Sequence, residues 1–389
     1  MSSEAFLRRL KDGETVIAAE GYIFEFERRG YLQAGAFVPE VVTEHPELVK
    51  QLHEEFVHAG SDVVLAFTYY GHRDKLRLIG KEDELENLNR KALSIAKDVA
   101  KATGTLMAGN ICNTTLYRAD DQSIVEKVRA MFKEQIEWAV EAGADFIVAE
   151  TFVEFSEAML ALESIKQFGQ GLPAVVMIAP SSNDYTVDGV LYEEACRQLE
   201  EAGAAAVGLN CARGPKSILP TMVKIRKACK GPIACLPVPY RTSSEFPTMQ
   251  ALIDPYTKQP SFPYNLPAHC CSRTDIENFA KECKELGVQY VGLCCGSCSH
   301  YLRVLAEGYG RKPPASKYSP DMTKHYMYGD DSTVRQYNEK IAKAFRGIWI
   351  ATEAKTLPKG LAISSRVLLI GELRASLNIT MLVFLPVVP

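Results

Sequence analysis

The chain has 389 residues, of which 47% are hydrophobic and 24% are charged, and its formal net charge is -4. This composition is typical of a globular protein and excludes a disordered or fibrous chain, and the charge balance provides no basic surface for nucleic acid. Because no apolar run reaches the roughly 18 uninterrupted residues of a membrane-spanning helix, we also predict no association with a membrane.

The N-terminal segment MSSEAFLRRLKDGE carries charges where a secretory signal has an apolar centre, so we expect a cytoplasmic protein. In that reducing compartment, the 11 cysteines are expected to be free thiols, metal ligands or catalytic groups rather than disulfides. Their roles therefore depend on the positions that the fold gives them.

Eight apolar runs alternate with amphipathic segments along residues 1–311. In chain order the predicted strands lie within 15–21, 59–67, 106–111, 142–150, 174–180, 202–210, 232–240 and 286–294, and the clearest predicted helices are 85–102, 121–141 and 190–202. Continuous apolar runs of this kind indicate buried parallel strands. We predict an α/β fold in which residues 1–311 form a (β/α)8 TIM barrel followed by a C-terminal arm. A doubly wound open sheet is the alternative, but it explains the strand count less well.

Four of the predicted strands share one register, because each follows a glycine that ends a helical segment. These glycines are Gly60, Gly143, Gly203 and Gly287. Seven residues after them stand Phe67, Glu150, Asn210 and Cys294, and eight residues after them stand Thr68, Thr151, Cys211 and Cys295. Barrel active sites lie at the C-terminal ends of the strands. We therefore predict that Glu150, Cys211, Cys294 and Cys295 meet at one mouth.

Three of these residues have the chemistry of a zinc site. Cys211, Cys294 and Cys295 offer three thiolates, and catalytic zinc usually has three protein ligands and one open position. A substrate thiol in the fourth position would be held as the nucleophilic thiolate at neutral pH. Gly292 and Gly296 would let the backbone turn closely around the ion.

The alternative for any single cysteine is buried packing, and we assign it to Cys112, Cys196, Cys229, Cys235 and Cys283. Cys295-Gly-Ser-Cys298 also fits a redox C-x-x-C motif, although this motif is weak evidence outside a thioredoxin-like βαβ unit. Cys270 and Cys271 precede a predicted helix instead of ending a strand, so we place them at the surface.

Two further kinds of side chain at the predicted mouth suit a cationic ligand. Glu150 ends an apolar run, where an ionised carboxylate is costly unless it pairs with a substrate ammonium or with a loop lysine. Tyr69 and Tyr70 follow the second strand, and aromatic faces attract onium cations. Packing at the barrel rim is the alternative for both tyrosines.

The segments GLNC (208–211), GLCCG (292–296), AE (149–150), ERRGYLQAG (27–35) and EHPELVKQLHEEFVHAGSDV (44–63) resemble the homocysteine S-methyltransferase family. The resemblance extends from about residue 7 to about residue 345. It implies a Zn2+-containing barrel that transfers a methyl group from a donor to the sulfur of L-homocysteine, giving methionine.

Matching the motifs residue by residue gives each position an implied role. Cys211, Cys294 and Cys295 take the zinc-ligand places. Glu150 takes the place of the carboxylate that holds the homocysteine amino group, and Tyr70 that of an aromatic residue that contacts betaine. We add Asn210, which directly precedes Cys211, to the predicted substrate-binding residues.

The chain departs from the family pattern at three places. The family's Asp-Gly pair after the first strand is Ala19-Glu20 here, and a shift of one residue on a strand reverses a side chain's direction. Either the local backbone compensates for the displaced Glu20, or homocysteine binding is altered. Phe37 and Thr151 replace a tryptophan and a tyrosine that contact the donor, so a sulfonium, S-methylmethionine or dimethylsulfoniopropionate, stands beside betaine as a candidate donor.

The remaining residues divide into two segments. Residues 312–346 contain a proline-rich linker and a predicted helix over 332–345 that Ser332 caps, and the resemblance implies that this arm contributes to a homo-oligomer. Residues 347–389 diverge from the family, and we assign them no role. Two other functions remain open, a zinc-binding barrel with a binding or regulatory role and a dithiol oxidoreductase that would require Cys298.

Overall fold

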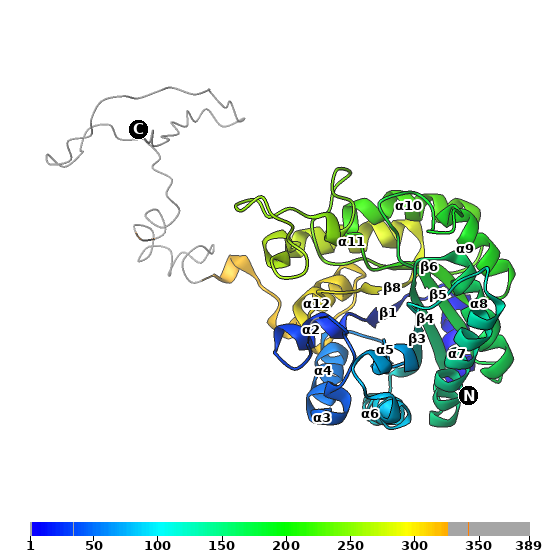
Figure 1. Ribbon diagram of the computed structural model, residues 1–389. Helices are drawn as coiled ribbons and strands as arrows, with labels where there is room; N and C mark the ends of the chain where they lie inside the picture. The colour runs from blue at the N-terminus through cyan, green and yellow to red at the C-terminus, as the bar shows by residue number, and fades with distance from the viewer. Residues whose placement is uncertain (1, 34, 326–340, 342–389) are drawn as a thin grey trace, which may run out of the picture. The chain divides into compact units, whose positions relative to one another are not determined.

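A computed structural model describes residues 2–33, 35–325 and 341 of the chain. Eight parallel strands pair in sequence order, and β8 closes the sheet by pairing with β1. Helices surround this barrel (Figure 1). The predicted (β/α)8 fold is therefore confirmed.

Each of the eight strands overlaps a predicted one. They are β1 (Val16–Ala19), β2 (Val63–Leu65), β3 (Leu106–Cys112), β4 (Phe146–Phe152), β5 (Ala174–Ile178), β6 (Ala206–Asn210), β7 (Ile233–Leu236) and β8 (Val288–Leu293). All their residues are buried except two that are partly buried, which is the reason for the continuous apolar runs in the sequence.

The helices of the described residues lie between and around these strands. They are α1 (Ser2–Lys11), α2 (Tyr22–Arg28), α3 (Val41–Glu44), α4 (Pro46–Ala59), α5 (Arg73–Leu78), α6 (Leu85–Thr103), α7 (Gln122–Ala142), α8 (Phe155–Phe168), α9 (Tyr192–Glu201), α10 (Pro215–Ala228), α11 (Arg273–Leu286) and α12 (Ser299–Gly308). The three predicted helices correspond to α6, α7 and α9. Within the described residues, no helix combines the length and the apolar character needed to span a membrane.

The four glycines that define the sequence register all have positive φ angles, between 74° and 116°. Three of them are the C-cap residues of α4, α7 and α11, and Gly203 follows α9 by two residues. A left-handed residue at the end of a helix satisfies its last carbonyl groups, and glycine adopts it without strain. The repeated glycine thus marks the start of four αβ connections, which lead from a helix into the next strand of the barrel.

The two ends of the barrel differ. Helix α1 closes the N-terminal end, where the ring of Phe6 stacks on that of Phe146 with their centroids 3.9 Å apart. Helix α2 and the long segment 237–272 lie at the opposite end, at which the strands finish (Figure 1). One end is therefore filled by packing, and the other is available for a site.

The compact unit that contains the barrel extends to Tyr318, seven residues beyond the predicted boundary. Arg311 donates hydrogen bonds to the Asp62 carboxylate and to the Thr15 carbonyl, which anchors the chain beneath the barrel. The predicted arm helix lies outside the described residues apart from Ile341, as does the segment 347–389. The homo-oligomer therefore remains a prediction.

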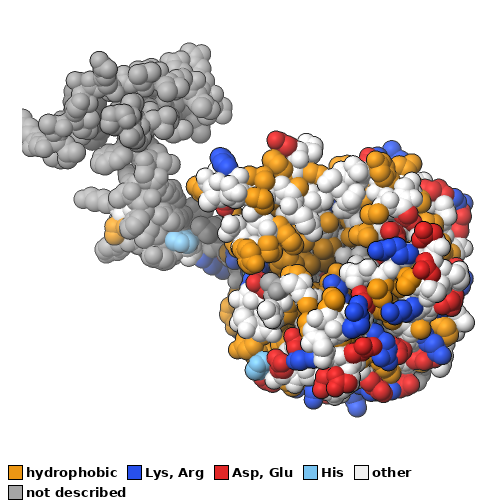
Figure 2. Space-filling model, viewed as in Figure 1, with side chains coloured by type: hydrophobic (Ala, Val, Ile, Leu, Met, Phe, Trp, Pro, Cys, Tyr) orange, Lys and Arg blue, Asp and Glu red, His pale blue; other side chains and the backbone are white. Residues whose placement is uncertain are grey.

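Charged side chains of both signs are interspersed over the helical part of the face seen in Figure 2, whereas hydrophobic side chains gather in the hollow at its middle. No large area of a single charge is visible on this face. Mixed charges of this kind keep a surface well hydrated without creating a field that attracts a polyanion.

A buried carboxyl group joins α8 to the loop after β3. Oε1 of Glu157 accepts hydrogen bonds from the backbone N–H of Thr114 at 2.7 Å and from its Oγ1 at 2.6 Å. Burial raises the pKa of Glu157 from 4.5 to about 7. The folded protein therefore retains a proton on this group that the unfolded chain releases.

We expect this proton to make the fold less stable as the pH rises from about 4.5 to about 7, because the unfolded state binds fewer protons over that range. Glu157→Gln keeps an oxygen for both Thr114 bonds but does not titrate. The wild-type protein should lose about 3 kcal/mol in its free energy of unfolding over this pH range because of Glu157, and the variant should not show this loss. Urea denaturation at pH 5 and pH 7.5 measures it, with the exposed Glu163→Gln as control. Equal pH dependence in both variants would contradict the prediction.

Candidate active site at the barrel mouth

The structure brings the three predicted zinc ligands together. Cys211 directly follows β6, and Cys294 and Cys295 directly follow β8. The Sγ atom of Cys295 lies 3.8 Å from that of Cys211 and 3.9 Å from that of Cys294. A tetrahedral zinc ion with Zn–S bonds of about 2.3 Å requires sulfur atoms about 3.8 Å apart. The three thiols therefore have the spacing of three corners of one zinc tetrahedron.

The thiol cluster already favours negative charge without a metal. Hydrogen bonds with Cys294 and Cys295 lower the pKa of Cys211 well below its usual value. The contact with Cys211 raises the pKa values of Cys294 and Cys295 in turn. The cluster thus favours the thiolate form at Cys211, and binding of a soft cation by all three sulfur atoms would release the protons of Cys294 and Cys295.

Three residues at or just after the ends of β4 and β6 have left-handed backbone conformations. Cys211 and Ala212 have φ angles of 61° and 51°, and Thr151 has a φ of 63°. Left-handed conformations are costly for residues other than glycine, above all for a β-branched residue such as Thr151, and they concentrate at functional sites. A sequence pattern that only counts strand residues gives no sign of them.

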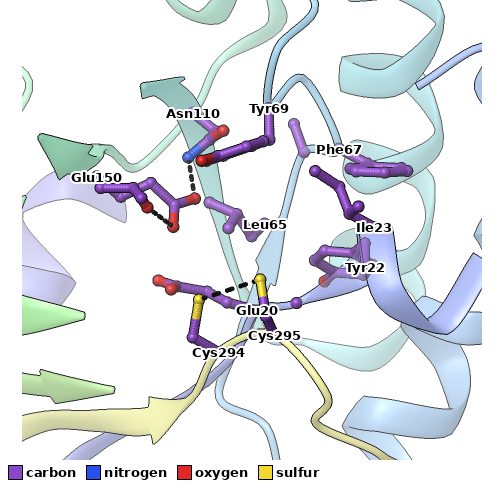
Figure 3. A pocket seen from close by; sticks show the side chains of 13 residues that line it. Glu20, Tyr22, Ile23, Leu65, Phe67, Tyr69, Asn110, Glu150, Cys294 and Cys295 are labelled. Atoms are coloured by element: carbon purple, nitrogen blue, oxygen red, sulfur yellow. Dashed lines mark hydrogen bonds between the residues drawn. The ribbon is translucent and has the colours of Figure 1, made fainter. Parts of the chain in front are cut away.

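Two buried carboxyl groups lie beside the thiol cluster. Glu150 belongs to β4, whereas Glu20 follows β1, and their side chains are 3% and 1% exposed. Asn210 donates from Nδ2 to Oε2 of Glu150 at 2.8 Å and to Oε2 of Glu20 at 3.4 Å. Asn110 of β3 donates to Oε1 of Glu150 at 2.7 Å (Figure 3). The amide groups therefore hold two carboxyl groups together.

Glu20 reaches the mouth although it stands one residue away from the family's aspartate. Carboxylate oxygens of Glu20 and Glu150 and the Sγ of Cys294 all lie within 4.8 Å of one another. Strand β1 ends at Ala19, and Gly21 then takes a φ of 84° to begin α2. The local backbone thus brings the displaced Glu20 to the mouth, and an effect on homocysteine binding stays a prediction.

The carboxyl pair holds protons that isolated carboxyl groups would lose. Burial raises the pKa of Glu150 to about 7. Burial and the neighbouring charge of Glu150 raise the pKa of Glu20 well above its usual value. Within the described residues, Oε1 of Glu20 has no hydrogen-bond partner. An entering ammonium would supply the missing donor and balance the charge of the pair.

The space between these groups is small. Glu20, Tyr22, Tyr69, Glu150 and Cys295 are among the residues that line it (Figure 3), and a water-sized sphere can enter about 20 Å³. This is room for roughly one water molecule. An amino acid can therefore bind here only by moving some of the lining side chains.

The two rim tyrosines have different surroundings. Tyr69 lines the cavity, and its hydroxyl lies 3.4 Å from Oδ1 of Asn113. Tyr70, the predicted donor contact, has a φ of 58°, and its backbone N–H donates to the Sγ of Cys112 at 3.2 Å. Cys112 is therefore buried packing that also supports the turn, and of the two rim tyrosines it is Tyr69 that lines the cavity.

The other predicted contacts are placed as follows. Thr151 lines the cavity, and its backbone N–H donates to Oδ1 of Asn210 at 3.0 Å. Phe37 is half-buried and stacks on Phe24, with a centroid distance of 6.1 Å. Asn110 was not predicted, although a polar residue within the apolar run 106–111 was a usable signal.

Three other residues of the cysteine and glycine pattern differ in role from the thiol cluster. Cys298 is the N-cap of α12, and its Sγ lies 3.2 Å from Nδ1 of His300. Cys271 is buried, so its predicted surface position is wrong. Gly292 lies within β8 and does not turn the backbone. A Cβ at this position would collide with the carbonyl of Ala18, so glycine is what allows β8 to approach β1 closely.

Comparisons with known proteins agree with these observations. The homocysteine S-methyltransferase family model matches residues 19–309. The chain is 32% identical to betaine–homocysteine S-methyltransferase 1 of Xenopus tropicalis over 90% of this chain and 85% of that protein. It is 31% identical to S-methylmethionine–homocysteine S-methyltransferase BHMT2 of Mus musculus, over 90% and 92%.

A likeness to a solved structure supports the fold. The metallated form of the homocysteine methyltransferase MmuM from Escherichia coli superimposes with a TM-score of 0.61, at 18% identity. The superposition covers 79% of this chain and 99% of that one. At this identity the likeness concerns the barrel alone.

We expect Gly21→Ala to disrupt the site, because the added Cβ would meet the backbone carbonyl of Cys294. Gly13→Ala is a matched control, since Gly13 has a similar φ of 76° but no atom within 4 Å of the added Cβ. The control should cost about 1 kcal/mol from backbone strain, and Gly21→Ala about 3 kcal/mol together with a loss of bound zinc. Urea denaturation and zinc stoichiometry measure both effects. Equal losses in the two variants would contradict the prediction.

Proposed function

Because the chain belongs to the homocysteine S-methyltransferase family, we propose that it catalyses Zn2+-dependent methyl transfer from an onium donor to L-homocysteine, giving methionine. The observation that supports this most directly is the spacing of the Cys211, Cys294 and Cys295 thiols beside a buried carboxyl pair. Zinc bound by these three thiolates would lower the pKa of the homocysteine thiol, so that the sulfur is a thiolate at neutral pH.

The carboxyl pair provides the place for the ammonium group of homocysteine. Glu150 and Glu20 lie within 4.8 Å of the Sγ of Cys294, so one small amino acid can span from the carboxyl pair to the thiol cluster. Asn210 and Asn110 hold Glu150 by one hydrogen bond to each of its oxygens. These bonds fix the direction from which the ammonium is held and thereby orient the thiol-bearing end of the substrate.

The transfer itself needs alignment more than acid–base catalysis. An electron pair of the homocysteine thiolate forms a bond to the methyl carbon, while the bond between that carbon and the donor's nitrogen or sulfur breaks. The donor leaves as a neutral amine or sulfide and keeps the electron pair of the broken bond. The burial of the thiols and carboxyl groups excludes water from the reacting sulfur.

We propose a sulfonium or betaine as the donor. The names of the related proteins include both betaine and S-methylmethionine. Phe37 and Thr151 stand where the family has larger or more polar aromatic contacts, which weakens the case for betaine. A reducing, cytoplasmic location fits the same chemistry, because all 11 cysteines are free thiols and zinc ligation requires them to stay so.

We expect wild-type protein loaded with zinc to form methionine from homocysteine and at least one of betaine, S-methylmethionine and dimethylsulfoniopropionate. Cys211→Ser should lose both bound zinc and activity, by a factor of at least about 100. Cys298→Ser is the matched control and should keep both, because Cys298 lies outside the thiol cluster. Methionine formation and zinc content are the measurements.

Other outcomes of this experiment identify other functions. Zinc binding without methyl transfer from any donor would favour a binding or regulatory barrel. Loss of activity in Cys298→Ser but not in Cys211→Ser would favour a dithiol oxidoreductase.

We expect Glu20→Gln to raise the KM for homocysteine about tenfold with a smaller change in kcat, because an amide cannot give up a proton to become anionic when the ammonium binds, whereas the Glu20 carboxyl group can. 4-Mercaptobutyrate, which lacks the amino group, provides the control substrate, and its KM should not change. Steady-state kinetics with both acceptors measure the effect. The same KM increase for both acceptors would show that Glu20 does not hold the ammonium.

A further inference from the structure

Lys75 is a buried cation without an anionic partner. It belongs to α5, and its side chain is 9% exposed. Its Nζ lies 4.1 Å from the centroid of the Tyr70 ring. In the part of the chain that the structure describes, Lys75 makes no side-chain hydrogen bond and no ion pair. A cation in this environment is held mainly by the electrons of the aromatic face.

The groups around Lys75 do not neutralise it. The neighbouring Asp74 already accepts bonds from Arg77 at 2.9 Å and from Thr115 at 2.6 Å. Burial lowers the pKa of His72 to about 4, so this ring is neutral at pH 7. Burial also raises the pKa of the Cys112 thiol, which therefore stays protonated. Burial lowers the pKa of Lys75, and the Asp74 carboxylate opposes this effect. Because Asp74 is also bonded to Arg77 and Thr115, it balances the charge of Lys75 only in part.

This charge lies close to the candidate site. Lys75 lies over the ring of Tyr70. The centroid of this ring is 4.3 Å from that of the Tyr69 ring. Tyr69 lines the cavity together with Glu150 and Thr151. Lys75 is therefore separated from the cavity by a pair of aromatic rings, and one of these rings already holds a cation.

We propose that Lys75 is a specificity-determining residue for the methyl donor, favouring onium donors that carry their own carboxylate over donors whose positive charge is uncompensated. The proposal rests on the proposed function. An additional cation next to Tyr70 is repelled by Lys75, whereas a zwitterion brings a carboxylate that Lys75 attracts. A unit charge about 10 Å from another changes binding by roughly tenfold at an effective dielectric constant of about 20.

Two donors of nearly equal shape test this. Dimethylsulfoniopropionate carries a carboxylate, and its carboxamide carries the same sulfonium without the negative charge. We expect wild-type protein to prefer the carboxylate donor in kcat/KM. Lys75→Met should reduce this preference about tenfold, mainly through the donor KM, whereas Lys75→Arg should keep it. Lys91→Met removes a charge from the exposed side of α6 and should change nothing.

The same two donors are also titrated calorimetrically into zinc-loaded wild-type protein and Lys75→Met, so that the ratio of their Kd values is known without turnover. A Kd ratio that is equal in both proteins, or the absence of binding by either donor, would overturn the proposal. Equal losses with both donors in Lys75→Met would indicate a structural role and would overturn it as well.

The remaining outcomes are also decisive. Lys75→Gln is a second neutral variant, and urea denaturation measures whether it and Lys75→Met fold. If neither variant folds, Lys75 has a structural role and its role in donor selection is rejected. If the donors bind wild-type protein with the expected preference but no methionine forms, the proposed function fails and the assignment of Lys75 holds.

Discussion

The pairing of β8 with β1 is the constraint on which the mouth depends. Their register aligns Ala19 with Leu293, and the N–H of Glu20 then donates to the carbonyl of Leu293 at 3.3 Å. The last residues of the two strands are thereby fixed side by side. Because Gly292 has no side chain, β8 can lie against the carbonyl of Ala18. The first and last strands, about 270 residues apart in the chain, thus bring a carboxyl group and two thiols to one place.

The charges at this mouth are arranged by burial more than by ion pairing. Thiols and carboxyl groups gather at the ends of β1, β4, β6 and β8, and amide groups rather than cations hold them. The buried cation, Lys75, is held on an aromatic ring at one side. Under the proposed function, a soft metal ion and an ammonium group would bind here because both offset the cost of ionising buried thiols and carboxyl groups.

The sequence was sufficient for those parts of the site that follow from strand register. Each apolar run became a strand, so Cys211, Cys294 and Glu150 could be placed at one mouth before the fold was known. The direction of Glu20 could not be predicted, because it depends on the left-handed Gly21 that ends β1 early. The different placement of the two rim tyrosines could not be predicted either, because the positive φ at Tyr70 leaves no periodic signal in the sequence.

The bond from the Thr151 backbone to Asn210 has an evolutionary consequence. Asn210 accepts a hydrogen bond from the N–H of residue 151 at 3.0 Å and also donates one to Oγ1 of Thr151 at 3.0 Å. Only the second bond depends on the side chain, so the bond to the left-handed backbone can form with other residues at this position. A lineage can therefore exchange a tyrosine for a threonine here while the backbone beside Glu150 keeps its course. Under the proposed function, substitutions at residue 151 could change the cavity wall that meets the donor without moving the thiols that would bind the acceptor.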